Sequence, residues 1–527
     1  YLQQAMITSL LVDSGRAVGV ADETGTQYSC QAVVIAGGTF LRGVIHIGTS
    51  RIEAGRAGEF PSNMLPAQLR DLGLYTGRMK TGTPARLNRQ SIDFSRFREQ
   101  PGDDVPRPFS LSTEDIPGPQ TPCYFGQTTE LAHAIIRKNL GHSPLYDGSI
   151  QGVPARYCPS IEDKIVHFPD REFHHIILEP EGLETEEIYV SGTGNSLPPE
   201  IQERFLRSIP GLEEACIQRP AYAIEYDFFQ PQQLRRTLEA DALPGLYLAG
   251  QVNGTSGYEE AAAQGLWAGI NSALKVQGRQ PFLLDRSQAY IAVMIDDLVL
   301  KGVNEPYRMF TSRAEHRLLL REDNADLRLL EKGYELGLHG ESAYRDLLRR
   351  REAIRQELQR LRSTQITPGE EINRSLGQRG SSPLHTPASL DKLLKRPELD
   401  YTLVEELSPP PQGVGSRERE QAEIEAKYEG YLARQMTEVE KFRHLEHMII
   451  PGDFSFQDLS GLSREIRQKL MQHRPETLGQ ASRIPGMTPA ALSLLRVLLQ
   501  KGSGGSSAEQ EKENAKARPG GPAKEPG

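Results

Sequence analysis

Residues 246–276 constrain the fold of this chain more than any other stretch. Residues 246–249 form a short apolar run of the kind that becomes a buried strand. Gly250 and Gln251 follow it, and after a glycine-containing turn a helix rich in small residues begins at about Glu259. A strand, a glycine turn and a helix in this order let backbone N–H groups approach a phosphate or a cofactor closely. The alternative is a helix that simply packs over a sheet.

The strand, glycine turn and helix predict an α/β domain, and two further glycine features support that prediction. Gly265 and Gly269 lie four residues apart, so they share one face of the expected helix, and we expect that face to pack tightly on a sheet. A second apolar run, residues 32–36, ends in Gly37 and Gly38. It is typical of the strand and glycine element of flavin proteins with two dinucleotide folds, although many other strands also end at a glycine turn.

Length, charge and cysteine usage restrict the classes of protein to consider. A chain of 527 residues is long enough for more than one domain with its own core. The net charge of −9 does not suggest a general nucleic-acid binder, so any contact with RNA needs a local basic patch. Four widely spaced cysteines without a CxxC pair argue against a zinc site or a disulfide framework and suit a reducing compartment. We find no signal peptide and no apolar run near the ~20 residues of a membrane span.

Two long segments resemble the signatures of a known family. Residues 246–276 resemble the second signature of the MnmG/GidA family, the flavin subunit of the enzyme that modifies the wobble uridine of certain tRNAs, and residues 156–164 resemble the first. The likeness continues through residues 307–329 and 461–495 and covers nearly the whole chain. One departure is that residues 154–155 are Pro-Ala, where the family usually has Gly-Pro.

The resemblance implies an α/β fold class: an incomplete FAD-binding Rossmann-like domain with an inserted α+β domain and an all-α C-terminal region. No G-x-G-x-x-G turn occurs near Tyr1, so we expect the chain to be an amino-terminally truncated fragment that binds FAD poorly. The expected domains are 1–80 and 226–305 for the two parts of the FAD domain, 81–225 for the inserted substrate and NAD domain, 306–453 for a helical domain, 454–501 for a partner-binding helical bundle, and 502–527 for a disordered tail.

Cys158 is the candidate catalytic residue. Pro159 suits the first turn of a helix, so the thiol would sit at the positive end of a helix over residues 160–166, and Arg156 and Lys164 add positive charge. These features favour a thiolate, which could attack C6 of a uracil ring and make C5 enolate-like. The alternative is a buried structural cysteine. The family is thought to use a second cysteine near its amino terminus, which is absent here, so which thiol attacks the base stays open.

The resemblance also implies the cofactor-binding residues. Those for FAD are Met6, Gly37, Gly38, Ser62, Gly250, Gln251 and Asn253. Those for NAD are Pro154, Ala155, Arg156, Tyr157, Cys158, Pro159, Ser160, Ile161, Glu162, Asp163, Lys164, Ile165, Val166, His167 and Phe168. Ser62 has helix capping as an alternative role, and Tyr157 has core packing. We interpret His174 and His175 as strand residues rather than metal ligands, since no third ligand is near.

The implied activity is FAD-dependent modification of wobble uridine U34 to 5-carboxymethylaminomethyluridine, with methylene-tetrahydrofolate as carbon donor and NADH as reductant. The implied partners are the GTPase MnmE, in a heterotetramer, together with tRNA and a second copy in a homodimer. The expected location is the bacterial cytoplasm, or the mitochondrion for a eukaryotic source, without membrane contact. The alternatives are a non-catalytic fragment that keeps the tRNA- and partner-binding surfaces, and a flavin disulfide reductase, which the lack of CxxC disfavours. For the arginine-rich helix at residues 345–363, we favour a solvated face with ion pairs over direct tRNA contact.

Overall fold

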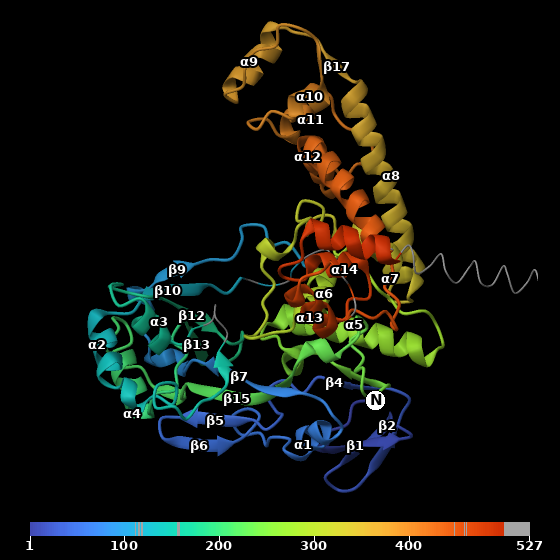
Figure 1. Ribbon diagram of the computed structural model, residues 1–527. Coiled ribbons are helices and arrows are strands. Elements are labelled where there is room, and N and C mark those ends of the chain that lie inside the picture. Colours follow the sequence, from blue (N-terminus) through green and yellow to red (C-terminus); the bar gives the residue numbers. More distant parts are fainter. Residues whose placement is uncertain are drawn as a thin grey trace, which may run out of the picture. The chain divides into compact units, whose positions relative to one another are not determined.

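The computed structural model describes residues 1–110, 112–113, 116, 118, 120–154, 159–446, 448–457, 459 and 461–499. It divides into two compact units (Figure 1). The first consists of Tyr1–Leu283 and Asp297–Met309, and the second of Leu284–Asp296 and the described residues from Phe310 onward. The first unit contains most of the strands and the second is almost entirely helical, which agrees with the predicted fold class. The expected tail at residues 502–527 lies outside the described residues.

The first unit is built mainly from β-strands. Its described strands are β1 Ile7–Asp13, β2 Arg16–Asp22, β3 Gln27–Ser29, β4 Val33–Ile35, β5 Val44–Ile47, β6 Ser50–Glu53, β7 Thr76–Thr83, β8 Arg86–Asn88, β9 Arg98–Gln100, β10 Cys123–Gln127, β11 Val153–Pro154, β12 His175–Pro180, β13 Glu187–Ser191, β14 Ile217–Arg219, β15 Tyr222–Phe229 and β16 Leu246–Leu248. They form the sheets β1-β2-β3, β11-β7-β15-β5-β6 and β14-β8-β13-β12-β10-β9, and the parallel pair β16-β4.

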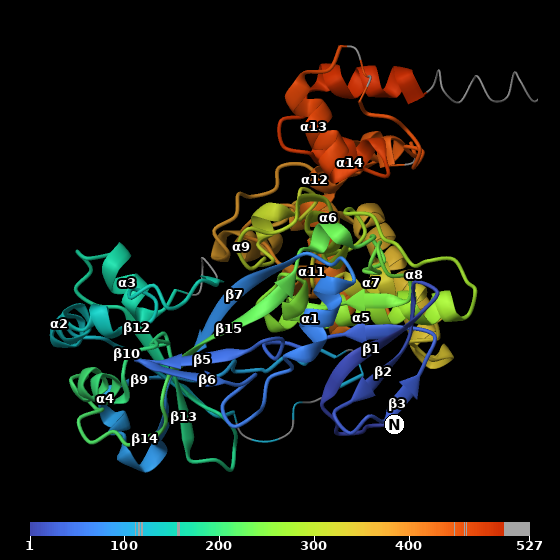
Figure 2. The same cartoon turned by 60° about the horizontal axis from the view of Figure 1, so that its bottom comes forward.

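The five-stranded sheet has one apolar and one charged face. Its central strands β7 and β15 pair antiparallel along their full length, and Figure 2 shows them side by side. Since successive side chains of a strand point to opposite faces and paired residues share a face, the register separates the two sets. The apolar face contains the buried residues Ile45, Met79, Ile224 and Tyr226. The charged face contains His46, Arg78, Lys80, Glu225 and Asp227.

The six-stranded sheet belongs to the predicted inserted region. Helices α2 Glu130–Lys138, α3 Ile161–His167 and α4 Pro199–Arg207 lie in the same region of the chain. Their apolar faces and the strands share one core, which includes Leu87, Ile136, Ile161, Ile165 and Phe205. Thr129 begins α2 by accepting a hydrogen bond from the Ala132 N–H, and α4 begins with a proline, as expected for helix starts.

Helix α5, Tyr258–Val276, confirms the helix predicted after the glycine turn. The prediction that its Gly265 and Gly269 pack tightly on a sheet is wrong for the described residues. A Cβ built on either glycine would have no atom within 4 Å, and Gly269 is exposed. The buried face of α5 is instead formed by larger side chains, among them Trp267 and Leu274. The hydrophobic effect selected this face, because these side chains bury far more apolar surface than glycine does.

The remaining α-helix that lies wholly within the described first unit is α1 Met64–Asp71. Helix α6 Tyr290–Lys301 spans the boundary between the units in sequence. The described helices of the second unit are α7 Ala325–Glu335, α8 Glu341–Ser363, α9 Glu370–Gln378, α10 Leu390–Leu394, α11 Tyr401–Leu407, α12 Ser416–Glu446, α13 Arg464–His473 and α14 Leu478–Arg483. Strands β17 Gln365–Ile366 and β18 Ala388–Ser389 form a short antiparallel pair.

A buried cluster that includes Leu361, Leu376, Leu393, Leu403 and Ala422 forms one core of the second unit. It joins side chains from α8, α9, α10, α11 and α12. The domain boundaries predicted from the sequence stay predictions. Across the described part of the chain, no helix is both long and apolar enough to cross a membrane.

Candidate functional site

Two glycine turns lie next to each other at the ends of the parallel strands β4 and β16. The strands pair in register, and the Ala249 N–H donates to the Ile35 carbonyl at 3.0 Å. Gly38 (φ +54°) and Gly250 (φ +78°) both adopt the left-handed region that favours glycine. A Cβ on Gly38 would lie 3.5 Å from Oε1 of Gln251, so the two turns and this amide share one place. Gly250 is buried, and a Cβ there would lie 3.5 Å from that of Ala261, so this turn is packed against α5.

Asn253, a predicted flavin contact, is held in a buried network. It lies at the end of the short 3-10 helix Gly250–Asn253, and its Nδ2 donates to Oε1 of Gln264 at 2.8 Å. Gln264 in turn donates to the Thr255 hydroxyl at 2.9 Å. The Asn253 Oδ1 has no hydrogen-bond partner among the described residues. The contacts therefore give Asn253 a structural role in fixing the loop, beside any role toward a cofactor.

Ser62, a predicted flavin contact like Met6, is bound to the first residue of β1. The Ser62 hydroxyl donates to the Ile7 carbonyl at 3.0 Å, one residue after Met6. Asn63, not Ser62, occupies the N-cap position of α1, and it makes no side-chain cap bond. The capping alternative for Ser62 is therefore wrong. The Ser62 hydroxyl instead connects the segment before α1 to the start of β1. The flavin role of Ser62 and Met6 stays a prediction.

The predicted NAD segment runs from strand β11 into helix α3. Pro154 pairs with Lys80 of β7. Ala155, Arg156, Tyr157 and Cys158 lie outside the described residues. Ser160 begins α3 with a capping box, in which its hydroxyl accepts from the Asp163 N–H and its own N–H donates to the Asp163 carboxylate. The helix predicted over residues 160–166 is confirmed.

Some residues of α3 are buried and hold the helix in place, whereas others are exposed to solvent. Ile161 and Ile165 are buried in the core. The buried carboxylate of Glu162 accepts hydrogen bonds from the Ser196 N–H at 2.9 Å and from the Ser143 hydroxyl at 3.1 Å. The remaining predicted residues, Val166, His167 and Phe168, are exposed. Three of the seven residues of this helix, Ile161, Glu162 and Ile165, are therefore buried in the protein.

Lys164 was expected to add positive charge beside Cys158. Its ammonium donates to the Gly192 carbonyl at 3.0 Å, and Glu162 and Asp163 place negative charge in the first turn of α3. These carboxylates weaken the positive potential at the start of α3, and that potential is what would stabilise a nearby thiolate. The lowered thiol pKa of Cys158 therefore stays a prediction.

A pocket of about 260 Å³ lies between the two large sheets of the first unit. It is lined by the predicted residues Pro159, Ser160 and Lys164, and by Lys80, Gly82, Pro84, Tyr189, Ser191, Gly192, Gly194, Asn195 and Ala223. The sequence analysis missed Lys80 and Tyr189. Lys80 is only 4% exposed, which is unusual for a lysine. The sequence feature that could have identified Lys80 as a site residue is its position within the strand-forming run of β7.

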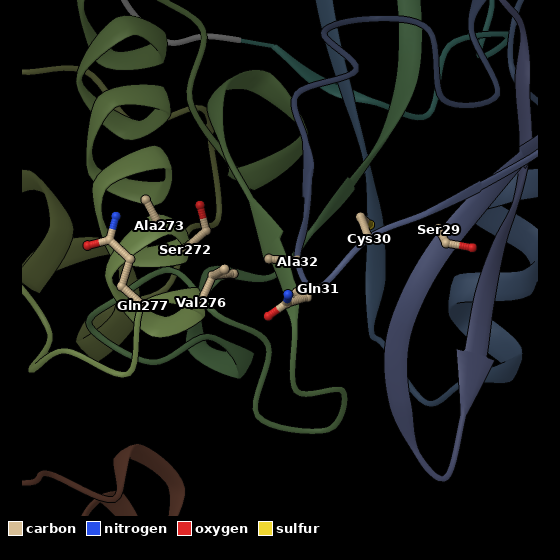
Figure 3. Close-up of a pocket in the computed structure, with 8 residues that line it drawn as sticks. All are labelled: Ser29, Cys30, Gln31, Ala32, Ser272, Ala273, Val276 and Gln277. Atoms are coloured by element: carbon tan, nitrogen blue, oxygen red, sulfur yellow. The ribbon is translucent and has the colours of Figure 1, made fainter.

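A second, larger pocket of about 690 Å³ is open to solvent and lies between the segment after β3 and the end of α5 (Figure 3). Its eight lining residues are Ser29, Cys30, Gln31, Ala32, Ser272, Ala273, Val276 and Gln277. None of these side chains is charged, and Cys30 is an exposed thiol. The lining therefore offers no acid–base pair for catalysis.

The pKa values of Cys123 and His174 show how these two residues could take part in the predicted chemistry. Burial, and then the charge of Glu179, raise the pKa of the Cys123 thiol, which makes it a poor nucleophile. Burial and neighbouring cations lower the pKa of His174 to about 4, so its ring is neutral near pH 7. Within the described residues, no group of three or more His, Cys, Asp or Glu side chains is arranged to hold a metal ion.

The arginines of α8 are all engaged in ion pairs. The pairs are Arg345–Glu341, Arg349–Asp346, Arg350–Asp326, Arg350–Glu418, Arg351–Glu331, Arg355–Glu352, Arg360–Glu357 and Arg362–Glu429. Several join residues three or four apart on the helix, the spacing at which side chains meet. The interpretation of this helix as an ion-paired face is confirmed.

Comparison with known proteins supports the resemblance to the MnmG/GidA family over most of the chain. The family model described as "Glucose inhibited division protein A" matches residues 1–280. Models for the "tRNA modifying enzyme MnmG/GidA C-terminal helical domain" and "C-terminal helical bundle" match residues 341–436 and 438–523.

Among curated relatives, the "tRNA uridine 5-carboxymethylaminomethyl modification enzyme MnmG" of Syntrophobacter fumaroxidans is 63% identical over 500 residues, covering 95% of this chain and 78% of the relative. The protein of the same name from Thermodesulfovibrio yellowstonii is 53% identical, covering 95% of this chain and 80% of the relative. The solved structure of Aquifex aeolicus GidA matches with a TM-score of 0.85 at 44% identity, covering 95% of this chain and 80% of that one. The α/β fold class with its helical C-terminal region is thereby confirmed, and the chain belongs to the MnmG/GidA family of tRNA-modifying enzymes.

Proposed function

We propose that this chain is the flavin subunit of an enzyme that converts the wobble uridine U34 of certain tRNAs into 5-carboxymethylaminomethyluridine. The observation that carries the proposal is the likeness, over 95% of the chain, to relatives named for this uridine modification, at 63% identity for the Syntrophobacter protein. The two signature segments support it, because both belong to the first unit, where the glycine turns and the smaller pocket lie.

The glycine turns fit a bound FAD. Gly38 is half-buried and Gly250 is buried, both have the left-handed backbone that favours glycine, and the Gln251 amide lies beside Gly38, so a cofactor could approach the main chain at Gly38. In this proposal Gly37, Gly38, Gly250 and Gln251 hold part of the cofactor. Bound FAD would supply the redox chemistry, with NADH as its reductant and methylene-tetrahydrofolate as the source of the carbon unit.

Cys158 is our proposed nucleophile. Addition of its thiolate to C6 of the uracil ring would make C5 enolate-like and ready to accept the one-carbon unit. The support is indirect, since Cys158 lies outside the described residues. The two residues that follow it in the chain, Pro159 and Ser160, line the smaller pocket, whereas the raised pKa of Cys123 disfavours that thiol.

We further propose that the protein acts as a homodimer in a heterotetramer with the GTPase MnmE, on tRNA in the bacterial cytoplasm. The bundle at residues 454–501 is the proposed contact for the GTPase. Its exposed apolar side chains Met471 and Val497 support this assignment, because apolar groups left in water can mark an interface.

Nucleoside analysis of tRNA tests the function. A strain that lacks its own copy of the gene is complemented with the full-length gene carrying Cys158→Ser, and the modified uridine is measured. We expect its loss, because a serine hydroxyl is a far weaker nucleophile than a thiolate. Cys216→Ser, at an exposed cysteine, is the matched control and should leave the modification intact. Wild-type levels of modified uridine with Cys158→Ser would remove this residue from the mechanism.

A further inference from the structure

Strand β6, Ser50–Glu53, forms one edge of the five-stranded sheet. It pairs with β5 on one side, and within the described residues no strand lies on its other side (Figure 1). All four of its residues are exposed, and the apolar side chain of Ile52 is 50% exposed. Natural proteins usually protect such an edge, because another strand can pair with it.

The free edge of β6 presents the backbone groups of Arg51 and Glu53. The Ala54 N–H donates to the Gly43 carbonyl at 3.1 Å, and these two residues continue the register of β5 and β6. Hydrogen-bonded and non-hydrogen-bonded pairs alternate along an antiparallel ladder. Ile52 therefore bonds toward β5, whereas Arg51 and Glu53 direct their N–H and C=O groups outward, where a further strand can bond to them.

The order Arg51-Ile52-Glu53 is complementary to itself. When a second copy of β6 runs antiparallel and is centred on Ile52, Arg51 of each copy lies opposite Glu53 of the other. In this register the two Arg51–Glu53 pairs are the hydrogen-bonded pairs, so they use the outward backbone groups of both copies. Opposite charges directly across a ladder stabilise the pairing, and like charges destabilise it.

The charges of β6 have few partners within one copy. Among the described residues Arg51 makes no ion pair, and the Glu53 carboxylate accepts a hydrogen bond from the Asn63 side chain at 3.0 Å. Charges on a strand edge usually discourage pairing with arbitrary strands. Here they favour a strand whose charges run in the opposite order, and β6 of a second copy is such a strand.

The opposite face of β6 contributes apolar surface. Ile52 pairs with Ile45 and shares its face of the sheet. Ile45 belongs to a small buried cluster with Ala54 and Ile224. A second copy would place its Ile52 against this one and extend the cluster, which would remove apolar surface from water.

The segment after β6 adds further apolar side chains. The hydrogen bond from Asn63 to Glu53 holds this segment beside the end of the strand. Phe60 and Met64, on either side of Asn63 in the sequence, are both exposed. Exposed apolar groups gathered near one strand edge are typical of an interaction surface.

We propose that two copies of this chain associate through β6, paired antiparallel about a two-fold axis at Ile52. A two-fold interface joins the same patch of both copies, so it requires a patch that is complementary to itself. The backbone pattern, the order of the charges and the apolar side chains of β6 all meet this requirement. The proposal rests on the proposed function in one respect, because it gives a surface to the homodimer proposed there.

Charge reversal tests the register. Sedimentation equilibrium measures the dissociation constant of the dimer for the full chain, Arg51→Glu, Glu53→Arg and the double variant that carries both changes. Each single change sets like charges opposite each other at two places, so we expect it to weaken the dimer by at least about tenfold. The double variant restores opposite charges and should dimerise within about threefold of wild type. Lys138→Glu, an equal change of charge at an exposed lysine of α2, is the control and should dimerise like wild type.

Disulfide cross-linking tests the position of the axis and does not depend on the charge variants folding. Ile52→Cys places the thiols of two copies opposite each other in a non-hydrogen-bonded pair, whose Cα atoms lie about 4.5 Å apart, a distance that a disulfide can span. Oxidation with copper phenanthroline should then give a covalent dimer on a non-reducing gel, with the bond located at position 52 by peptide mass spectrometry. Ser50→Cys is the matched control on the same strand, because its two copies would lie about four residues apart along the ladder, roughly 14 Å, and should not cross-link.

Several outcomes would overturn the proposal: a wild-type chain that sediments as a monomer, folded single variants that dimerise like wild type, a double variant no tighter than the single ones, or equal cross-linking of Ser50→Cys and Ile52→Cys. The test is independent of catalysis. A chain that dimerises through β6 but never modifies uridine would refute the proposed function alone, whereas a uridine-modifying dimer unaffected by the β6 variants would refute this interface alone.

Discussion

Two regions that contain several cations, helix α8 and the charged face of β7 and β15, balance their charges in opposite ways. In α8 no two arginines share a carboxylate, and the partner is often one helical turn away, as with Arg355 and Glu352. On the sheet, three arginines share Asp227. The comparison teaches that arginine density in a sequence is a poor guide to anion binding, because what attracts a phosphate is the charge that remains after pairing.

The largest effect should come from removing the shared carboxylate. Asp227→Asn keeps the size of the side chain but removes the buried anion that three guanidinium groups share, of which those of Arg42 and Arg70 are 44% and 32% exposed. Breaking a fully buried pair typically costs about 3–5 kcal/mol, and water at Arg42 and Arg70 reduces that cost, so we expect a fall of a few degrees in the first unit's melting temperature, measured by scanning calorimetry. Asp346→Asn in α8, whose partner Arg349 is exposed, is the control and should melt like wild type. Equal melting of both variants would break the comparison.

A smaller effect should depend on pH through Glu225. Burial opposes its ionisation, but His46 and Arg78 outweigh burial, so its folded pKa of about 2 lies below the ordinary value of 4.5. Ionised Glu225 therefore contributes stability above about pH 4.5 that is lost as the pH falls toward 2. At 1.36 kcal/mol per pKa unit the full contribution is roughly 3 kcal/mol, of which only part is lost by pH 3. Urea unfolding of the wild type and Glu225→Gln at pH 7, 4.5 and 3 checks this expectation. The gap between them should narrow as the pH falls, and a constant gap would contradict it.

The smallest effect should come from α8. Replacing Arg345, Arg349 and Arg355 together by Gln removes three exposed cations that are already paired. We expect tRNA affinity in a filter-retention assay to change by less than about threefold, since exposed ion pairs offer little free charge to a polyanion. A loss of about tenfold or more would show that the pairs open to contact tRNA, and the distinction between the two regions would fail.

Much of the fold could be predicted from local patterns. The run at residues 246–249 and the glycines after it predicted β16, its turn and α5, because a buried strand and a glycine turn leave direct marks in sequence. The ion-paired face of α8 followed from the spacing of its charges. These features depend on residues close together in the chain.

The rest depended on contacts across long stretches of sequence. The packing face of α5 was mispredicted because Gly265 and Gly269 show which residues are small, not which face meets a partner. Lys80 was missed because its neighbours in the pocket, such as Tyr189, come from strands far away in the chain. Ser62 was assigned a possible cap from its position before a helix, but its hydroxyl binds Ile7 instead.

The single carboxylate of Asp227 also has a consequence for conformational entropy. Arg78 donates to Asp227 and to the Arg42 carbonyl, so its side chain is held by two acceptors before any ligand arrives. Ordering a long side chain at the moment of binding costs about 0.5–1.5 kcal/mol, and that cost falls on folding here rather than on association. The charged face is therefore preorganised, and an anion that reaches it meets cations already fixed in place.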